Sequence, residues 1–180
     1  MSVEIRQDLL DQVKLSFSFQ RHADLNTVKL IGALVSRSDS WEAGTENLLL
    51  QFEHSPGTMQ VSKDCVTMRT LYRFIAKAPG KRLVEMLQIE CTFETTYQLG
   101  NGYQPGEGEV NSFRSGNAVF NSWPFFREYV QSTAARMNLP IPPVSFLRLV
   151  PLGPTEGEPK QVVSEVKTKR AKNARFSSAD

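Results

Sequence analysis

The sequence predicts an α+β fold in which a four-stranded antiparallel β-meander packs against one long C-terminal helix, with a further helix at the N-terminus. Apolar and polar residues alternate over four successive segments between residues 26 and 98, as they do in strands that are buried on one face. Helical spacing of apolar residues appears before and after these segments. Pro79-Gly80 marks a turn between the last two segments, and Pro56-Gly57 marks a turn or bulge within the second. We therefore expect one sheet with an apolar and a charged face.

Residues 1–24 are predicted to form a helical extension of the main domain. Ile5, Leu9, Val13 and Phe17 recur every four residues, and this spacing places them on one side of a helix. Charged residues lie between them. We expect the apolar side of this helix to pack on the rest of the protein.

The four predicted strands belong to a main domain that covers residues 25–150. In the clearest of them, every second residue from Val66 to Ala76 points to one face, while Thr67, Arg69 and Arg73 point to the other. The last strand is much longer than the five or six residues of an average strand. The predicted strands cover residues 26–38, 47–62, 64–78 and 82–98.

Residues 99–118 contain five glycines and are predicted to form a flexible connection. Their GxGxxxG spacing resembles a phosphate-binding loop. However, no lysine follows it, and Glu107 and Glu109 would repel a phosphate. Nucleotide binding is therefore not predicted.

The C-terminal helix is predicted to begin at Ser122 as its N-cap, with Pro124 in its first turn, and to end at Asn138 before Pro140. Its beginning gathers more aromatic side chains than one buried stripe can cover. We expect some of them to face another subunit, another element or a ligand. These aromatic residues are Trp123, Phe125, Phe126 and Tyr129.

Residues 151–180 are predicted to form a disordered basic tail, because they contain few residues that could build a core. The rest of the chain carries equal numbers of acidic and basic residues. No aromatic residues are interleaved with the basic ones, so nucleic-acid binding is not favoured over a role in solubility. The six basic residues are Lys160, Lys167, Lys169, Arg170, Lys172 and Arg175.

The composition argues against several other classes of protein. The apolar run at residues 30–35 is far shorter than the ~20 residues of a membrane span. The first ten residues carry acids and no signal-peptide core, which favours the cytoplasm. Cys65 and Cys91 lack the spacing of a metal site or a disulfide framework, so we expect free thiols and no metal or cofactor.

The sequence contains no recognisable catalytic motif. His22 and His54 are the two histidines, and no nucleophile elbow or paired-carboxylate arrangement stands out. The chain is therefore predicted not to be an enzyme. A site assembled from distant residues stays an alternative, because catalytic groups need not be neighbours in sequence.

Residues 119–147 resemble the signature of the SecB chaperone family, in which an aromatic-Pro-aromatic-x-Arg-Glu helix start leads to a Leu-Pro-Pro-type segment. With the four preceding strands, the resemblance covers residues 26–150. The matching positions are Trp123, Pro124, Phe125, Arg127, Glu128, Ala135, Arg136, Leu139, Pro140, Pro142 and Pro143.

The resemblance implies a cytosolic, ATP-independent holdase that binds unfolded polypeptides in apolar grooves and assembles as a dimer of dimers. Typical members are acidic and pass clients to the SecA motor, whereas the body of this chain is neutral. The N-terminal helix and the strand-like residues 144–150 look more like the branch that accompanies toxin–antitoxin pairs, which implies an antitoxin client in place of exported preproteins. The candidate client-binding residues are Trp41, Leu48, Leu50, Phe52, Trp123, Phe125, Phe126 and Tyr129.

Two other functions remain open from the sequence. One is a dedicated assembly subunit that binds a single partner through the same apolar surface. The other, more distant, is a hotdog-like thioesterase, which would need an acid or a histidine over a ligand pocket. Binding of several unrelated unfolded proteins would distinguish a holdase from both.

Overall fold

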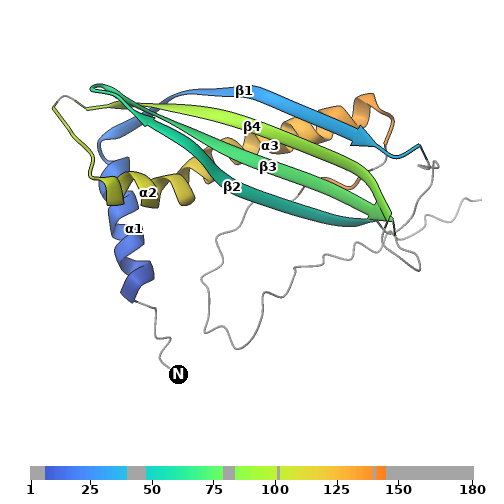
Figure 1. The fold of residues 1–180 in the computed structure, drawn as a ribbon, viewed down its shortest axis with the longest axis horizontal. Helices are drawn as coiled ribbons and strands as arrows, with labels where there is room; N and C mark the ends of the chain where they lie inside the picture. Colours follow the sequence, from blue (N-terminus) through green and yellow to red (C-terminus); the bar gives the residue numbers. More distant parts are fainter. Residues whose placement is uncertain (1–6, 40–47, 79–83, 101, 140, 145–180) are drawn as a thin grey trace, which may run out of the picture.

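The computed structural model describes residues 7–39, 48–78, 84–100, 102–139 and 141–144, and within them the predicted α+β fold is confirmed. Four long strands form an antiparallel sheet, helix α3 lies along one face of it, and α1 and α2 lie together near one end (Figure 1). The elements are α1 (Gln7–Gln20), β1 (Ala23–Arg37), β2 (Leu49–Val61), β3 (Cys65–Ala78), β4 (Val84–Leu99), α2 (Glu107–Ser115) and α3 (Asn117–Arg136).

The strand order in the sheet is β1-β4-β3-β2, so the meander consists of β2, β3 and β4, and β1 lies beside β4. The alternation of apolar residues determines the face that each residue occupies, but it does not determine which neighbour a strand takes. In the described residues β1 and β2 are therefore the two edge strands. We call the sheet face that packs on α3 the inner face and the opposite one the outer face.

The core lies between α3 and the inner face of the two central strands. Phe74 and Ile89 are fully buried there, and Phe126 and Val130 of α3 pack against them. The Tyr72 hydroxyl donates a hydrogen bond to the carbonyl oxygen of Val119 at 2.6 Å, which joins β3 to the helix. A second cluster joins the two shorter helices to the other end of the sheet: Phe19, Val66, Met68, Tyr97, Val110, Phe113 and Ala118 belong to it.

Helix α1 is confirmed, but the apolar side predicted for it is largely uncovered. Val13 is 43 % and Phe17 is 55 % exposed, whereas Phe19 is fully buried against Phe113 of α2. The helix packs mainly on α2 rather than along the sheet. Its four-residue stripe therefore has little surface to cover, and Phe19 near its end anchors it.

Helix α2 occupies residues that were predicted to be a flexible connection, so that prediction was wrong. Its first turn is capped by Glu109, whose carboxylate accepts a hydrogen bond from the Gly106 N–H at 2.8 Å and one from the Tyr103 hydroxyl at 3.0 Å. Val110 and Phe113 are buried beneath it. Burial of these two side chains outweighs the low helix propensity of the glycines.

Helix α3 begins at Asn117, five residues before the predicted N-cap Ser122, so the predicted start was wrong. The Ser122 hydroxyl lies inside the helix and donates to the carbonyl oxygen of Ala118 at 2.8 Å. Pro124 also lies inside the helix, where it is exposed. The predicted end is close to the observed one, because Asn138 adopts a left-handed conformation with φ 54° just after the helix.

Candidate functional site

The outer face of the sheet carries a network of ion pairs across neighbouring strands. Arg73 of β3 lies between Glu53 of β2 at 3.7 Å and Glu90 of β4 at 3.3 Å. Farther along β3, Arg69 pairs with Glu94 at 3.1 Å. Because acidic and basic side chains are paired across this face, it does not present the acidic surface of a typical SecB protein.

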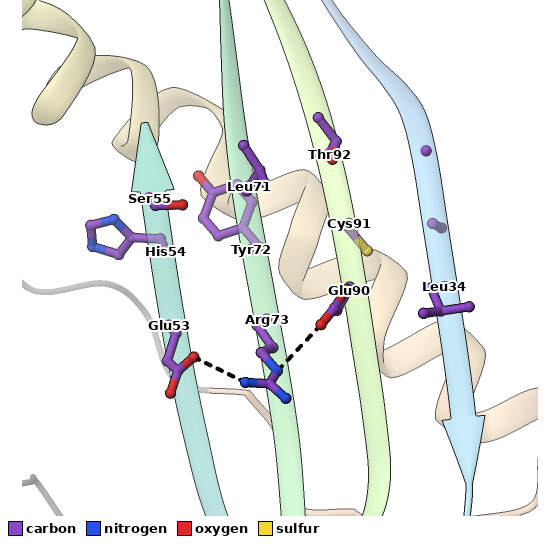
Figure 2. Close-up of a pocket in the computed structure, with 12 residues that line it drawn as sticks. Leu34, Glu53, His54, Ser55, Leu71, Tyr72, Arg73, Glu90, Cys91 and Thr92 are labelled. Atoms are coloured by element: carbon purple, nitrogen blue, oxygen red, sulfur yellow. Dashed lines mark ion pairs between the residues drawn. The ribbon is translucent and has the colours of Figure 1, made fainter. Parts of the chain in front are cut away.

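A hollow of about 520 Å³ opens on the outer face between these ion pairs. Figure 2 shows Arg73 with its two glutamates at one side of the hollow and Leu71 beyond them. Gly32, Ser55 and Thr92 are small residues that keep it open, and Leu71 is 44 % exposed. The hollow is suited to contact with an apolar side chain of a partner.

The hollow offers no activated nucleophile. Cys91 lines it, but burial raises the pKa of its thiol to about 12. The thiol is therefore protonated at neutral pH, and a protonated thiol is a poor nucleophile. In the described ranges no cluster of three His, Cys, Asp or Glu residues could hold a metal ion.

A second apolar surface lies at the edge of the inner face, where β2 meets α3. Leu48, Leu50 and Phe52 are half-buried there, and the ring of Phe52 meets Trp123 edge-on with the ring centres 5.9 Å apart. We call these four residues the β2–α3 strip. Leu48, Leu50 and Phe52 stay half-exposed because, within the described residues, β2 has a neighbouring strand on one side only, whereas Trp123 is buried.

His54 continues the inner-face row of β2 beyond Phe52. Its imidazole centre lies 6.4 Å from the ring centre of Tyr72. Partial burial lowers the pKa of His54 below its ordinary value of 6.5, because burial disfavours the charged form. The inner-face row of Leu48, Leu50, Phe52 and His54 is therefore uncharged at neutral pH.

The predicted client-binding residues do not form one continuous surface. Four of them make up the β2–α3 strip, although Trp123 itself is only 7 % exposed. Phe126 is fully buried and stacks on Tyr72 at 4.6 Å, which is a core position. Trp41 lies outside the described residues.

Phe125 and Tyr129 lie on a different side of α3 from Trp123. Residues two positions apart are rotated by about 200° around a helix axis, so Phe125 cannot share the side of Trp123. Phe125 is 47 % exposed and Tyr129 is half-buried. These two residues are four positions apart and form a separate aromatic surface on the helix.

Among the residues of the SecB signature, Arg127 holds the chain that follows α3. The guanidinium Nε of Arg127 donates a hydrogen bond to the carbonyl oxygen of Val144 at 2.7 Å, and Val144 and Leu139 are buried. Pro124, Glu128 and Pro143 are exposed. Pro140 lies outside the described residues.

Several exposed apolar residues were not among the predicted site residues. Phe120 is 48 % exposed. It was not considered as a site residue because the helix was predicted to begin only at Ser122. Leu71 interrupts the polar outer row of β3, between Arg69 and Arg73, and this interruption was visible in the sequence. Leu34 of β1 is 59 % exposed.

The chain is similar to proteins of known structure. No protein-family model matches the chain, and no curated protein matches it significantly. Among solved structures, it is similar to the SecB-like chaperone Rv1957 of Mycobacterium tuberculosis, solved in complex with a ChAD peptide from the Rv1956 HigA1 antitoxin. The TM-score is 0.65 at 16 % sequence identity, over 78 % of this chain and 99 % of the other. The chain therefore has a SecB-like fold, as its signature residues implied.

No helix in the described part of the chain is both long and apolar enough to span a membrane.

Proposed function

We propose that this protein is an ATP-independent, SecB-like chaperone that binds extended apolar segments of unfolded polypeptides, with an antitoxin as its natural client. The observation that carries this proposal is the β2–α3 strip, whose Leu48, Leu50 and Phe52 are uncharged and half-exposed beside a strand edge that is free within the described residues. The SecB-like fold, shared with a chaperone solved with an antitoxin peptide, supports it.

The strip supplies binding energy of a suitable size. A client segment that buries about 400 Å² of apolar surface gains about 10 kcal/mol before costs, at ~25 cal/mol per Å². Loss of translational freedom and ordering of the segment offset most of this gain. The expected result is moderate affinity with tolerance of client sequence, which suits a chaperone that must release what it binds.

An antitoxin client fits the surface charge better than export does. Transfer to the SecA motor uses an acidic sheet face, whereas Arg69, Arg73 and Lys77 are paired with glutamates on the outer face here. We place the protein in the cytoplasm, where an antitoxin is made. Exported preproteins are the second class of client.

We further propose that two copies associate through β1, and that such dimers pair. The supporting observation is the set of large apolar side chains that β1 leaves exposed within one chain: Leu25, Leu30, Ile31 and Leu34. Isolated monomers rarely expose so much contiguous apolar surface. Burial of this surface against a second copy would remove it from water.

The proposed function is tested by light scattering from two unrelated proteins that refold from denaturant, with and without a molar excess of the chaperone. Suppression of both signals is expected, and loss of suppression in the double variant Leu50→Ser/Phe52→Ser would assign it to the strip. Leu71→Ser on the outer face is the matched control, and thermal melting checks that each variant is folded. No suppression by the wild-type protein would contradict a general holdase.

Binding to one antitoxin peptide without suppression of either scattering signal would instead identify a dedicated assembly subunit. The outer-face hollow around Leu71 would then become the first surface to test for the partner, because it accepts an apolar side chain. Titration of the Leu71→Ser variant with the same peptide measures this directly.

A further inference from the structure

The free edge of β2 presents main-chain hydrogen-bonding groups beside the β2–α3 strip. In the described residues β2 pairs with β3 alone, from Leu49 to Val61. Every second residue of such a strand turns its N–H and C=O away from its neighbour. Pro56 lacks an N–H, and the register shifts between Pro56 and Met59. The regular, unpaired edge therefore runs from Leu49 to Ser55.

The side chains along this edge alternate in character. Leu50 and Phe52 point to the inner face and are half-buried against the core, and His54 follows them in the same row. Gln51 and Glu53 point to the outer face between them. An incoming strand would meet the same two environments, since its own side chains alternate with the same period.

The outer row also carries a charge preference. Glu53 and Glu90 share one cation, Arg73, and the side chain of Glu53 is 45 % exposed. Two carboxylates on one guanidinium leave a net negative charge at this edge. A basic residue on the outer side of an incoming strand would be favoured next to Glu53.

We propose that the client joins the sheet as an added strand along β2 between Leu49 and Ser55. Its large apolar residues face inward beside Leu50 and Phe52, and its polar residues, one of them basic, face outward beside Glu53. This rests on the proposed chaperone function and narrows its substrate class. The client segment is amphipathic with a two-residue period, so an apolar stretch without that alternation is a poor client.

Edge β1 does not fit the same client. Leu30 faces inward opposite Phe93, while Leu34 faces outward opposite Glu90, so both faces of this edge are apolar. Its register also shifts twice, between Leu25 and Thr27 and between Leu30 and Gly32. An added strand with a polar outer row would leave Leu34 uncovered. The added client strand is therefore specific to β2.

The test uses two isomers of one nine-residue synthetic peptide, in which leucine, valine and phenylalanine alternate with threonine and lysine. In one isomer the backbone nitrogens of the apolar residues are methylated, and in the other those of the polar residues. The two sets of N–H groups point to opposite edges of an extended strand. Methylation of the N–H groups that face β2 removes the hydrogen-bond donors and places methyl groups against the strand. Methylation of the N–H groups that face solvent leaves the hydrogen bonds to β2 in place.

We expect the two isomers to differ at least tenfold in affinity, measured by fluorescence anisotropy, with the better isomer close to the unmethylated peptide. Equal affinities would overturn an added strand of one fixed direction, because each isomer keeps the donors for only one direction, and would leave a side-chain-driven chaperone intact. If the unmethylated peptide binds no better than a scrambled peptide of the same composition, the alternation requirement fails. Absence of binding by both, together with no suppression of aggregation, would reject the chaperone function itself.

Discussion

The two edge strands of the sheet, β1 and β2, differ in how their apolar side chains are distributed over the two faces of the sheet. β1 leaves Leu34 59 % and Ile31 43 % exposed, and its apolar residues occupy both faces. Apart from Leu49, the large apolar residues of β2 lie on the inner face, where Phe52 packs on Trp123 of α3. The exposed residues of its outer face are polar.

The difference indicates two kinds of contact. An edge that is apolar on both faces is suited to a permanent interface, which resembles a core divided in two. An edge that is partly covered by α3 and carries polar residues on its outer face is suited to transient binding of a partner. We therefore propose self-association at β1 and client binding at β2, and the four predictions below test this separation.

The largest effect is expected from charge at the β1 edge. The double variant Leu30→Lys/Leu34→Lys places two like charges in the proposed subunit interface, and we expect its dimer dissociation constant to rise by about 100-fold or more. Sedimentation equilibrium measures the change. Val61→Lys, at the exposed end of β2, is the matched control and should leave the mass unchanged. A wild-type protein that sediments as a monomer would contradict the assignment of β1.

A smaller effect is expected when one apolar side chain is truncated on each edge. Phe52→Ala should lower the free energy of unfolding by about 2 kcal/mol, below the 3–5 kcal/mol of a fully buried phenylalanine, because part of its surface is already in water. Leu34→Ala should change it by less than about 0.5 kcal/mol. Urea denaturation of each variant, at concentrations where the protein is monomeric, measures both values. Equal losses would remove the distinction between the edges.

An intermediate effect, independent of both edges, is expected at the end of the sheet where α1 and α2 meet. A hydrogen bond from Ser18, with further bonds from the Gly106 N–H and the Tyr103 hydroxyl, lowers the pKa of Glu109 below its ordinary value of 4.5. As the pH falls, the unfolded chain takes up this proton first. The stabilisation is therefore complete above the unfolded-state pKa and is lost as the pH falls through the folded-state pKa.

Glu109→Ala should cost about 1 kcal/mol of stability at pH 7, because it removes the acceptor of the capping hydrogen bonds. It should also remove this component of the acid dependence as the pH falls below 4.5. Chemical denaturation across that range measures both effects. Client binding and dimer mass should match the wild type, and a change in either would mean that the two edges depend on this end of the molecule.

The smallest effect is expected from the outer row of β2. Glu53→Gln removes one exposed ion pair with Arg73 and should change the free energy of unfolding by less than about 0.5 kcal/mol. Affinity for the lysine-containing peptide should nevertheless fall about threefold, and its salt dependence should weaken. Glu85→Gln, which removes the ion pair with Lys77 farther from the client edge, is the control. A similar loss in both variants would indicate general electrostatic attraction.

The fold was largely predictable because its sheet is amphipathic with a clear two-residue period. Val66, Met68, Tyr72 and Phe74 are buried as their alternation predicted. The order of the strands was not predictable, since alternation carries no information about neighbours. Helix α2 was missed because glycines dominate its surroundings, whereas its stability depends on tertiary burial of Phe113.

The candidate site was predictable only in part, for a geometric reason. Leu50, Phe52 and Trp123 come together as predicted residues of one surface, but the rotation of the helix separates Phe125 and Tyr129 from them. Phe126 is a core residue, since it stacks on Tyr72. Local sequence shows which side chains are apolar, whereas their exposure depends on how α3 lies across the sheet.

Site-specific photo-crosslinking tests the separation of the two edges most directly. Benzoylphenylalanine is introduced in place of Leu50 on β2 and, in a second protein, in place of Leu34 on β1, and each is irradiated with a labelled unfolded client. We predict that the β2 position crosslinks to the client and the β1 position to a second copy of the chain. Client crosslinks of equal yield from both positions, or from β1 alone, would contradict the account.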